Sequence, residues 1–232
     1  FLSSINSALY LNAKPVFIDI NPKNYCLDLD KLSKKFEELK RKNKKVKALI
    51  VTDYAGQMCD WKKIKELSKK YKFYTINDNC HSLGSKYKND QRYAVKFADV
   101  VTHSFHPVKV ITTGEGGCLS TNNPDIYKKV LELRSHGVIR TKKLKRKYGN
   151  WYYSMNRLGY NYRMPDINAS LGISQLKKIK KFIKKRKSIA KEYFYGFRNN
   201  KNIILPFIDN FCDHSFHLFP IQIKFKDLKL SK

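Results

Sequence analysis

Short runs of β-branched and apolar residues alternate along the chain with longer stretches in which lysines and apolar residues recur at helical spacing. This alternation is typical of the α/β class, in which a mostly parallel sheet is covered by helices. Strands are predicted at residues 16–20, 46–52, 73–76, 98–103 and 117–121. Helices are predicted at residues 29–41, 61–70, 124–135 and 165–195, with Asp28 and Asn123 as possible N-caps of the first and third.

The pattern changes near the end of the chain, where short strands are predicted at residues 203–205 and 219–225. We therefore expect a large domain over residues 1–190 and the start of a smaller α+β domain over residues 191–232. Residues 140–153 are rich in Lys, Arg, Tyr and Trp and are predicted to form an exposed excursion. The sequence opens without an initiator Met or a signal-peptide pattern and stops without a closing element, so truncation at both ends is expected.

The composition fits a globular protein. Its 232 residues, of which 42% are hydrophobic, suffice for one sizeable α/β domain or for a large domain and part of a second. The chain lacks a run of eighteen apolar residues, so no membrane partner is expected and a cytoplasmic location is predicted. The five cysteines are odd in number and form no C-x-x-C pair, which argues against a disulfide framework or a structural zinc site.

The formal net charge of +29 raises the question of nucleic-acid binding. The lysines are spread over nearly every predicted helix, where they alternate with apolar positions, so solvated helix faces are the favoured interpretation. Attraction of anionic small substrates is the second interpretation, and nucleic-acid binding is the third.

Polar residues follow three of the predicted strands. They lie at residues 53–57, 77–81 and 104–109. In an open α/β sheet the ligand crevice lies beyond the carboxyl ends of the strands, so these three segments are expected to converge on one crevice.

Lys109 differs from the many other lysines because it follows Pro107 and precedes a Gly-rich segment with no amphipathic pattern. A lysine partly withdrawn from water becomes nucleophilic, as imine chemistry requires. A loop lysine that covers a turn is the alternative.

Asp78 ends a predicted strand, where an aspartate commonly caps the next helix. The functional alternative is a carboxylate that keeps a cofactor's pyridine nitrogen protonated, so that the ring can accept electrons. His81 follows three residues later and could help to orient such a ring.

Two other patterns are weaker evidence for a functional site. Residues 112–117 match neither the Walker pattern nor G-x-G-x-x-G and are predicted to form a tight turn that leads into a strand. The tetrapeptide His-Ser-Phe-His occurs at residues 103–106 and 214–217 without an acid or cysteine at ligand spacing, so no metal site is predicted.

Taken together, these segments resemble the aminotransferases of the DegT/DnrJ/EryC1/StrS family, and most of all those that aminate C4 of a UDP-linked 4-keto-6-deoxy sugar in pseudaminic acid biosynthesis. The resemblance covers essentially the whole chain in the right order. The matching motifs lie at residues 53–57, 78–84, 104–109, 112–117, 134–137, 158–166 and 217–219.

The resemblance implies the type I fold of enzymes that use pyridoxal 5'-phosphate. This fold has a mostly parallel seven-stranded sheet with helices on both faces and a smaller C-terminal α+β domain, and it works as a homodimer with shared active sites. Lys109 would form the Schiff base with the cofactor and move the proton during the reaction. Asp78 would bind the ring nitrogen, His81 would lie beside the ring, Ser104 would donate to the phosphate, and Asn161 would reach the phosphate of the other subunit.

Three further matches, Arg163, His217 and Gln57, are expected at the substrate side of the site. The chain departs from the family pattern at Asn77, where an acid is frequent. It departs again at residues 79 and 80, where Asn and Cys replace small residues. The helix start that cradles the phosphate in this family would precede residue 1.

The resemblance implies transamination of a nucleotide-linked 4-keto-6-deoxy sugar with glutamate as amino donor, in the synthesis of amino sugars for surface glycans. The residues leave C3 against C4 amination open, and also UDP against dTDP or GDP. A sugar dehydratase of the same fold is a rival, although such relatives replace the lysine. The rival from another class is a basic nucleic-acid-binding protein, and a catalytically incomplete remnant is a third possibility.

Overall fold

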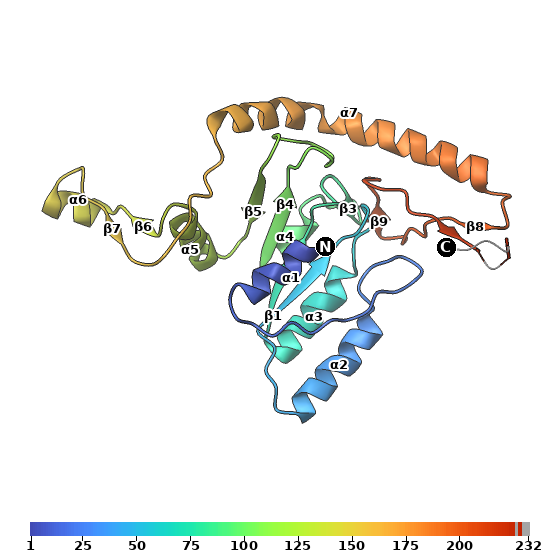
Figure 1. Cartoon of the computed structure of the whole chain (residues 1–232), viewed down its shortest axis with the longest axis horizontal. Helices are drawn as coiled ribbons and strands as arrows, with labels where there is room; N and C mark the ends of the chain where they lie inside the picture. Colours follow the sequence, from blue (N-terminus) through green and yellow to red (C-terminus); the bar gives the residue numbers. More distant parts are fainter. Residues whose placement is uncertain (226, 229–232) are drawn as a thin grey trace.

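The computed structural model describes residues 1–225, 227 and 228, and its centre is a four-stranded sheet (Figure 1). In sheet order the strands are β1 (Ala48–Thr52), β2 (Tyr74–Asp78), β4 (Val100–Ser104) and β5 (Gly117–Ser120). β1, β2 and β4 are parallel, and β5 pairs antiparallel with β4. Thr52 pairs with Asp78, which pairs with Thr102, so three strands end along one edge of the sheet.

Helices connect the strands. They are α1 (Leu2–Leu9), α2 (Leu29–Arg41), α3 (Trp61–Tyr71), α4 (Tyr93–Phe97), α5 (Pro124–Arg134), α6 (Lys142–Tyr148) and α7 (Asp166–Phe197). The predicted caps are confirmed, because Asp28 accepts from the backbone of Asp30 and Lys31, and Asn123 accepts from the backbone of residues 125 and 126. The short helices α1, α4 and α6 were not predicted.

The core lies between the sheet and helices α2, α3 and α4. The residues with no exposed surface there include Trp61, Ile64, Met58 and Val101. The opposite face of β2 carries Asp78, which accepts a hydrogen bond from Ser4 of α1. Helices therefore lie on both faces, and the predicted α/β class is confirmed.

Two expectations about the sheet are wrong for the described residues. The predicted strand at residues 16–20 makes one isolated bridge, between Ile20 and Leu27, and leaves Val16 51% and Phe17 69% exposed. β-branched residues stabilise a strand only when it joins a sheet, and this segment finds no further partner among the described residues. The sheet has four strands there, whereas the resemblance implies seven.

The C-terminal part packs against the first part of the chain. α7 runs without a break over 32 residues and crosses the predicted boundary at residue 191, so the division into two domains stays a prediction. β9 (Cys212–Asp213) pairs with β3 (Lys86–Tyr87). β8 (Ile203–Ile204) pairs with β10 (Gln222–Ile223), which confirms strands within the two predicted terminal ranges.

The predicted exposed excursion is confirmed as an arm. β6 (Val138–Ile139) and β7 (Ser154–Met155) form a two-stranded ribbon that carries α6 at its tip. Figure 1 shows this arm, residues 138–155, projecting away from the sheet. All five cysteines are free, as expected. Within the described residues, no helix is both long and apolar enough to cross a membrane.

Candidate active site

The aligned ends of β1, β2 and β4 place Asp78 at the middle of one edge of the sheet. Its Oδ2 accepts from Ser4 Oγ at 3.1 Å and from Thr52 Oγ1 at 3.5 Å. Its Oδ1 accepts from the backbone N–H of Cys80 at 3.2 Å. Residues 79–85 form turns rather than a helix, so the helix-cap interpretation of Asp78 is wrong. The carboxylate lies beyond the strand ends, in the region of Asp78, His81 and Lys109 that we call the crevice.

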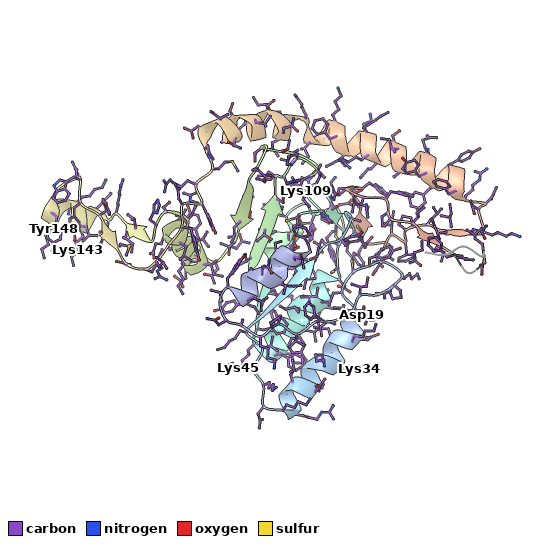
Figure 2. All side chains as sticks on the ribbon, in the orientation of Figure 1. Asp19, Lys34, Lys45, Lys109, Lys143 and Tyr148 are labelled. Carbon is purple, nitrogen blue, oxygen red and sulfur yellow. The ribbon has the colours of Figure 1, made fainter. Side chains whose placement is uncertain are left out.

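Lys109 lies in the loop between β4 and β5. Its backbone N–H donates to the carbonyl of His106 at 2.9 Å, and its side chain is half-buried. In the described part of the chain, its amino group has no hydrogen-bond or ion-pair partner. Figure 2 shows Lys109 at the end of the sheet, apart from the exposed lysines Lys34 and Lys45. The side chain is thus free to bind a ligand.

The loop around Lys109 is held by its own hydrogen bonds. The carbonyl of Phe105 accepts from Thr113 N and Thr112 Oγ1, both at 2.9 Å, and Asn168 of α7 donates to the carbonyl of Thr113 at 2.6 Å. Gly114 and Gly116 have φ angles of 79° and 154°, which confirms the predicted tight turn before β5. These contacts fix the backbone on the C-terminal side of the lysine.

His81 lies close enough to Lys109 for the lysine's charge to act on its ring. Its Nδ1 accepts from the backbone N–H of Ala55 at 3.3 Å, and its ring lies 5.7 Å from that of Tyr54. Burial, with a smaller contribution from the Lys109 ammonium, lowers the pKa of His81 to about 4. The imidazole is therefore neutral at physiological pH and accepts through Nδ1.

His217 reaches the same place from the C-terminal segment, and its ring centroid lies 4.4 Å from that of His81. Arg186 of α7 fixes this segment by donating to the carbonyls of Phe216 at 3.2 Å and His217 at 3.1 Å. Burial first, then the charges of His81 and Lys109, lower the pKa of His217 to about 3. Its Nδ1 is buried without a hydrogen-bond partner in the described residues, so it is available to a polar ligand.

The other predicted site residues are placed differently. Ser104 ends β4 in a half-buried position, and its Oγ accepts from His106 N at 3.3 Å. Asn161 and Arg163 are exposed, and no hydrogen bond among the described residues joins their side chains to the crevice. The amide of buried Gln57 donates to Asp209 and to the carbonyl of Met58, so its contacts are those of a structural tie.

Sequence reasoning missed two residues of the site. Ser4 contacts Asp78 from α1, and Arg186 positions the loop that carries His217. The serine has no sequence signal of its own. The arginine stands in a lysine-rich helical stretch where a solvated face is the default prediction.

The groups that meet in the crevice fit pyridoxal phosphate. A free amine at Lys109 suits the cofactor's aldehyde carbon, and the Asp78 carboxylate suits a protonated ring nitrogen. The neutral imidazole of His81 and the hydroxyl of Ser104 suit the ring hydroxyl and the phosphate. His217 Nδ1 is a further polar group beside His81 that has no hydrogen-bond partner in the described residues.

Comparison with known proteins identifies relatives of the chain. The UDP-4-amino-4,6-dideoxy-N-acetyl-beta-L-altrosamine transaminase of Campylobacter jejuni is 39% identical over 224 residues, which are 96% of this chain and 56% of that protein. GDP-perosamine synthase of Escherichia coli is 33% identical over 193 residues, covering 83% of this chain and 48% of that protein. The structure of Helicobacter pylori PseC, an aminotransferase involved in pseudaminic acid biosynthesis, superposes with a TM-score of 0.86 at 31% identity, covering 99% of this chain and 58% of PseC.

The chain thus spans about half the length of these relatives. The model of one aminotransferase family matches it from residue 1 to residue 232. The chain therefore belongs to the DegT/DnrJ/EryC1/StrS aminotransferase family.

Proposed function

We propose that the whole protein transfers an amino group from glutamate to a nucleotide-linked 4-keto-6-deoxy sugar, with pyridoxal phosphate as cofactor, in the synthesis of amino sugars for surface glycans. One observation carries the proposal. The free amine of Lys109 lies at the same edge of the sheet as the Asp78 carboxylate and the neutral His81 imidazole. The relatives named above act on sugars, which supports this substrate class.

Bound pyridoxal phosphate would supply an electron sink for the carbanion that forms when the amino donor loses its α-proton. The chain's own residues then have distinct tasks. Lys109 Nζ would hold the cofactor covalently until the amino donor takes its place, and would then move the proton from the donor carbon to the cofactor's C4′. In the second half-reaction it would move a proton from C4′ to the carbon of the acceptor sugar. Asp78 would keep a proton on the ring nitrogen, held in place by Ser4 and Thr52.

The neighbours of these two residues would orient the ligands. His81 would donate a hydrogen bond through Nε2 beside the ring, because its pKa of about 4 keeps it neutral and its Nδ1 already accepts from Ala55. Ser104 would donate to the phosphate, and Asn161 of a second copy would reach the same phosphate. We assign His217 and Arg163 to the substrate or the donor carboxylate, whereas Gln57 is occupied by Asp209 in this structure.

Amination at C4 of a UDP-linked sugar is the preferred form of the proposal, because the Campylobacter relative is a UDP-sugar transaminase and covers nearly the whole chain. A GDP-linked substrate is the main alternative, since GDP-perosamine synthases are also relatives. Turnover with UDP-linked and GDP-linked 4-keto-6-deoxy sugars, followed by mass spectrometry of the product, separates the two.

A homodimer and a cytoplasmic location also belong to the proposal. The segment that carries Asn161 and Arg163 exposes large apolar side chains, with Leu158 83%, Tyr162 70% and Ile167 85% exposed. Contiguous exposed apolar surface is typical of an interface. Light scattering of the whole protein is expected to give twice the monomer mass, and a monomer that still turns over would contradict a shared site.

Absorption spectroscopy of the pyridoxal phosphate-loaded whole protein tests the reaction. We expect the visible band of lysine-bound cofactor to disappear on addition of glutamate, with one 2-oxoglutarate formed per site. Lys109→Ala should abolish both changes. The matched control is Lys143→Ala on the arm, which should behave as wild type.

A wild-type protein without the lysine-bound band would refute the assignment of Lys109. A band that does not respond to glutamate would refute glutamate as the amino donor. Duplex DNA of unrelated sequence supplies the last control, because salt-sensitive binding there would support the nucleic-acid rival instead.

A further inference from the structure

A second carboxylate, Asp53, lies beneath the crevice and has no part in the reaction as described. It directly follows β1 and has no exposed surface. Five groups donate to its two oxygens at 2.8 to 3.0 Å, and none of them carries a formal charge. They are the backbone N–H of Cys59, the indole N–H of Trp61, the side-chain amides of Asn77 and Asn79, and the hydroxyl of Tyr93.

Asp53 contacts each residue of the strand end that carries Asp78. Its Oδ2 accepts from Nδ2 of Asn77 and Nδ2 of Asn79, both at 3.0 Å. Its backbone N–H donates to the carbonyl of Asp78 itself at 3.1 Å. One residue therefore fixes three consecutive positions, with Asp78 in the middle.

The alternation of a β-strand gives these contacts a direction. Successive side chains point to opposite faces, so Asn77 and Asn79 face the core while Asp78 faces Ser4 and the crevice. If the two asparagines rotate or shift, the backbone between them moves and Asp78 turns away from its ligand.

Asp53 also reaches the next ligand-facing residue. Its carbonyl accepts from Ser82 Oγ at 3.1 Å, directly after His81 in the chain. The backbone N–H of Ala55, two residues after Asp53, donates to His81 Nδ1. The segment at Asp53 thus supports both Asp78 and His81.

A carboxylate suits this place better than an amide. All five partners donate, and only an ionised carboxylate accepts at both oxygens without presenting a donor. Burial raises the pKa of Asp53 to about 6, while the hydrogen bonds from Cys59, Trp61, Tyr93 and Asn77 lower it. At neutral pH the group is therefore ionised and uses its full accepting capacity.

We propose that Asp53 is a positioning residue that sets the direction of the Asp78 carboxylate through Asn77 and Asn79. The inference rests on the proposed cofactor chemistry. Its stability part, however, can be measured without cofactor.

A double-mutant cycle on the whole protein tests the link. Asp53→Asn presents a donor to groups that already donate, and Asn77→Asp places a second carboxylate against the first. Each single change should lower the melting temperature of the cofactor-free protein. The pair Asp53→Asn with Asn77→Asp restores one acid and one amide at this contact and should recover part of the loss, while Asn79 and Tyr93 still donate towards residue 53.

The effect of Asp53 on the position of Asp78 is measured with cofactor bound. Asp53→Asn should lower kcat about 10- to 100-fold, the size expected for a small misplacement of a catalytic group. It should also shift the pH at which the bound cofactor changes its absorption, while KM for glutamate changes less. Tyr93→Phe, which removes one donor and keeps the carboxylate, should show the same changes to a smaller degree if Asp53→Asn does not fold.

The matched control is Asp99→Asn. Asp99 ties the other end of β2 by accepting from Thr75 N at 2.8 Å and Thr75 Oγ1 at 2.9 Å. Its loss should lower the melting temperature and leave the pH profile of the bound cofactor unchanged.

Two outcomes would overturn the inference. If Asp53→Asn lowers stability but keeps the wild-type kcat and cofactor pH profile, as Asp99→Asn should, Asp53 is only structural. If the two single changes lower the melting temperature additively, with no recovery in the pair, the Asp53–Asn77 contact is not the link. A wild type that binds no cofactor would refute the proposed function as well, whereas either outcome above leaves it standing.

Discussion

The two tryptophans of the chain lie in regions that are built differently. Trp61 has no exposed surface, and its indole N–H donates to Asp53 at 2.8 Å beneath the crevice. Trp151 is 77% exposed on the arm, where its ring touches only that of Tyr152 among the described aromatic residues. One residue type is thus a buried support in one region and a solvent-facing group in the other.

The difference separates two halves of the predicted site. Asp78, His81 and Lys109 lie in the crevice, where hydrogen bonds from other segments of the same chain hold their surroundings. Asn161 and Arg163 lie on the exposed segment beside the arm. The chain therefore encloses the first group by itself, whereas it holds the backbone of the second group against the end of α5 and leaves both side chains exposed.

Matched substitutions of the two tryptophans should give the largest contrast. Trp61→Phe removes a hydrogen bond to a buried carboxylate and leaves a cavity, so we expect the free energy of unfolding to fall by about 2–4 kcal/mol. Trp151→Phe should change it by less than about 0.5 kcal/mol. Urea denaturation followed by circular dichroism measures both, and equal losses would show that the arm is packed as firmly as the crevice.

Two glycines allow a second, smaller test. Gly56 has a φ of 110°, and an added Cβ would lie 2.8 Å from Ser215 Oγ and 2.9 Å from Phe216 N, in the loop that carries His217. Gly56→Ala should therefore cost about 2 kcal/mol and displace that loop. Gly196, near the end of α7, has nothing within 4 Å of its Cβ position, so Gly196→Ala should stabilise by about 0.5–1 kcal/mol. Melting temperatures that move in the same direction in the two variants would contradict these two predictions.

The sequence predicted the parts of the crevice that depend on local pattern. The β-branched runs before Asp78 and Ser104 announce strands, and the rule for strand ends then brings Asp78 and Lys109 together. The sequence could not predict the approach of His217 to His81, because that contact depends on Arg186 and on the path of the chain after α7. The strand predicted at residues 16–20 failed for a related reason, since strand propensity is realised only where a sheet edge is available.

The sequence also named Asn77 and Asn79 as departures from the family pattern without giving their purpose. In the structure both are donors to the buried Asp53, so each contributes to a network whose members are far apart along the chain. A network of this kind has no periodicity, and only the fold brings its members together. Its residues therefore look like exceptions until the contacts are known.

Acid should change the charge of the crevice and leave that of the arm unchanged. Burial lowers the pKa of His81 and His214 to about 4 and that of His217 to about 3. The arm, residues 138–155, contains no Asp, Glu or His, so its charge does not change over this range. Mild acid therefore titrates groups in and around the crevice and leaves the arm as it is.

Proton linkage gives the direction in which the free energy of unfolding changes with pH. Between pH 6.5 and 4 the unfolded chain binds protons that the folded histidines refuse, so the free energy of unfolding falls as the pH falls. Asp53 acts in the opposite sense, because its pKa is raised to about 6 and the folded state takes up its proton first. Burial also lowers the pKa of His103, so four histidines oppose one carboxylate and the net change is a loss.

For His214, which is 6% exposed, the loss is about 1 kcal/mol between pH 6.5 and 5.5. The less enclosed rings of His81 and His217 should contribute less because solvent screens them. Urea denaturation at a series of pH values measures the slope. His214→Asn should flatten the slope relative to wild type, whereas a slope that stays unchanged in this variant would show that burial does not lower the pKa of the ring. Proteolysis within the lysine-rich arm should proceed at the same rate at pH 6.5 and 5.5 after correction for the protease's own pH dependence, because nothing there titrates.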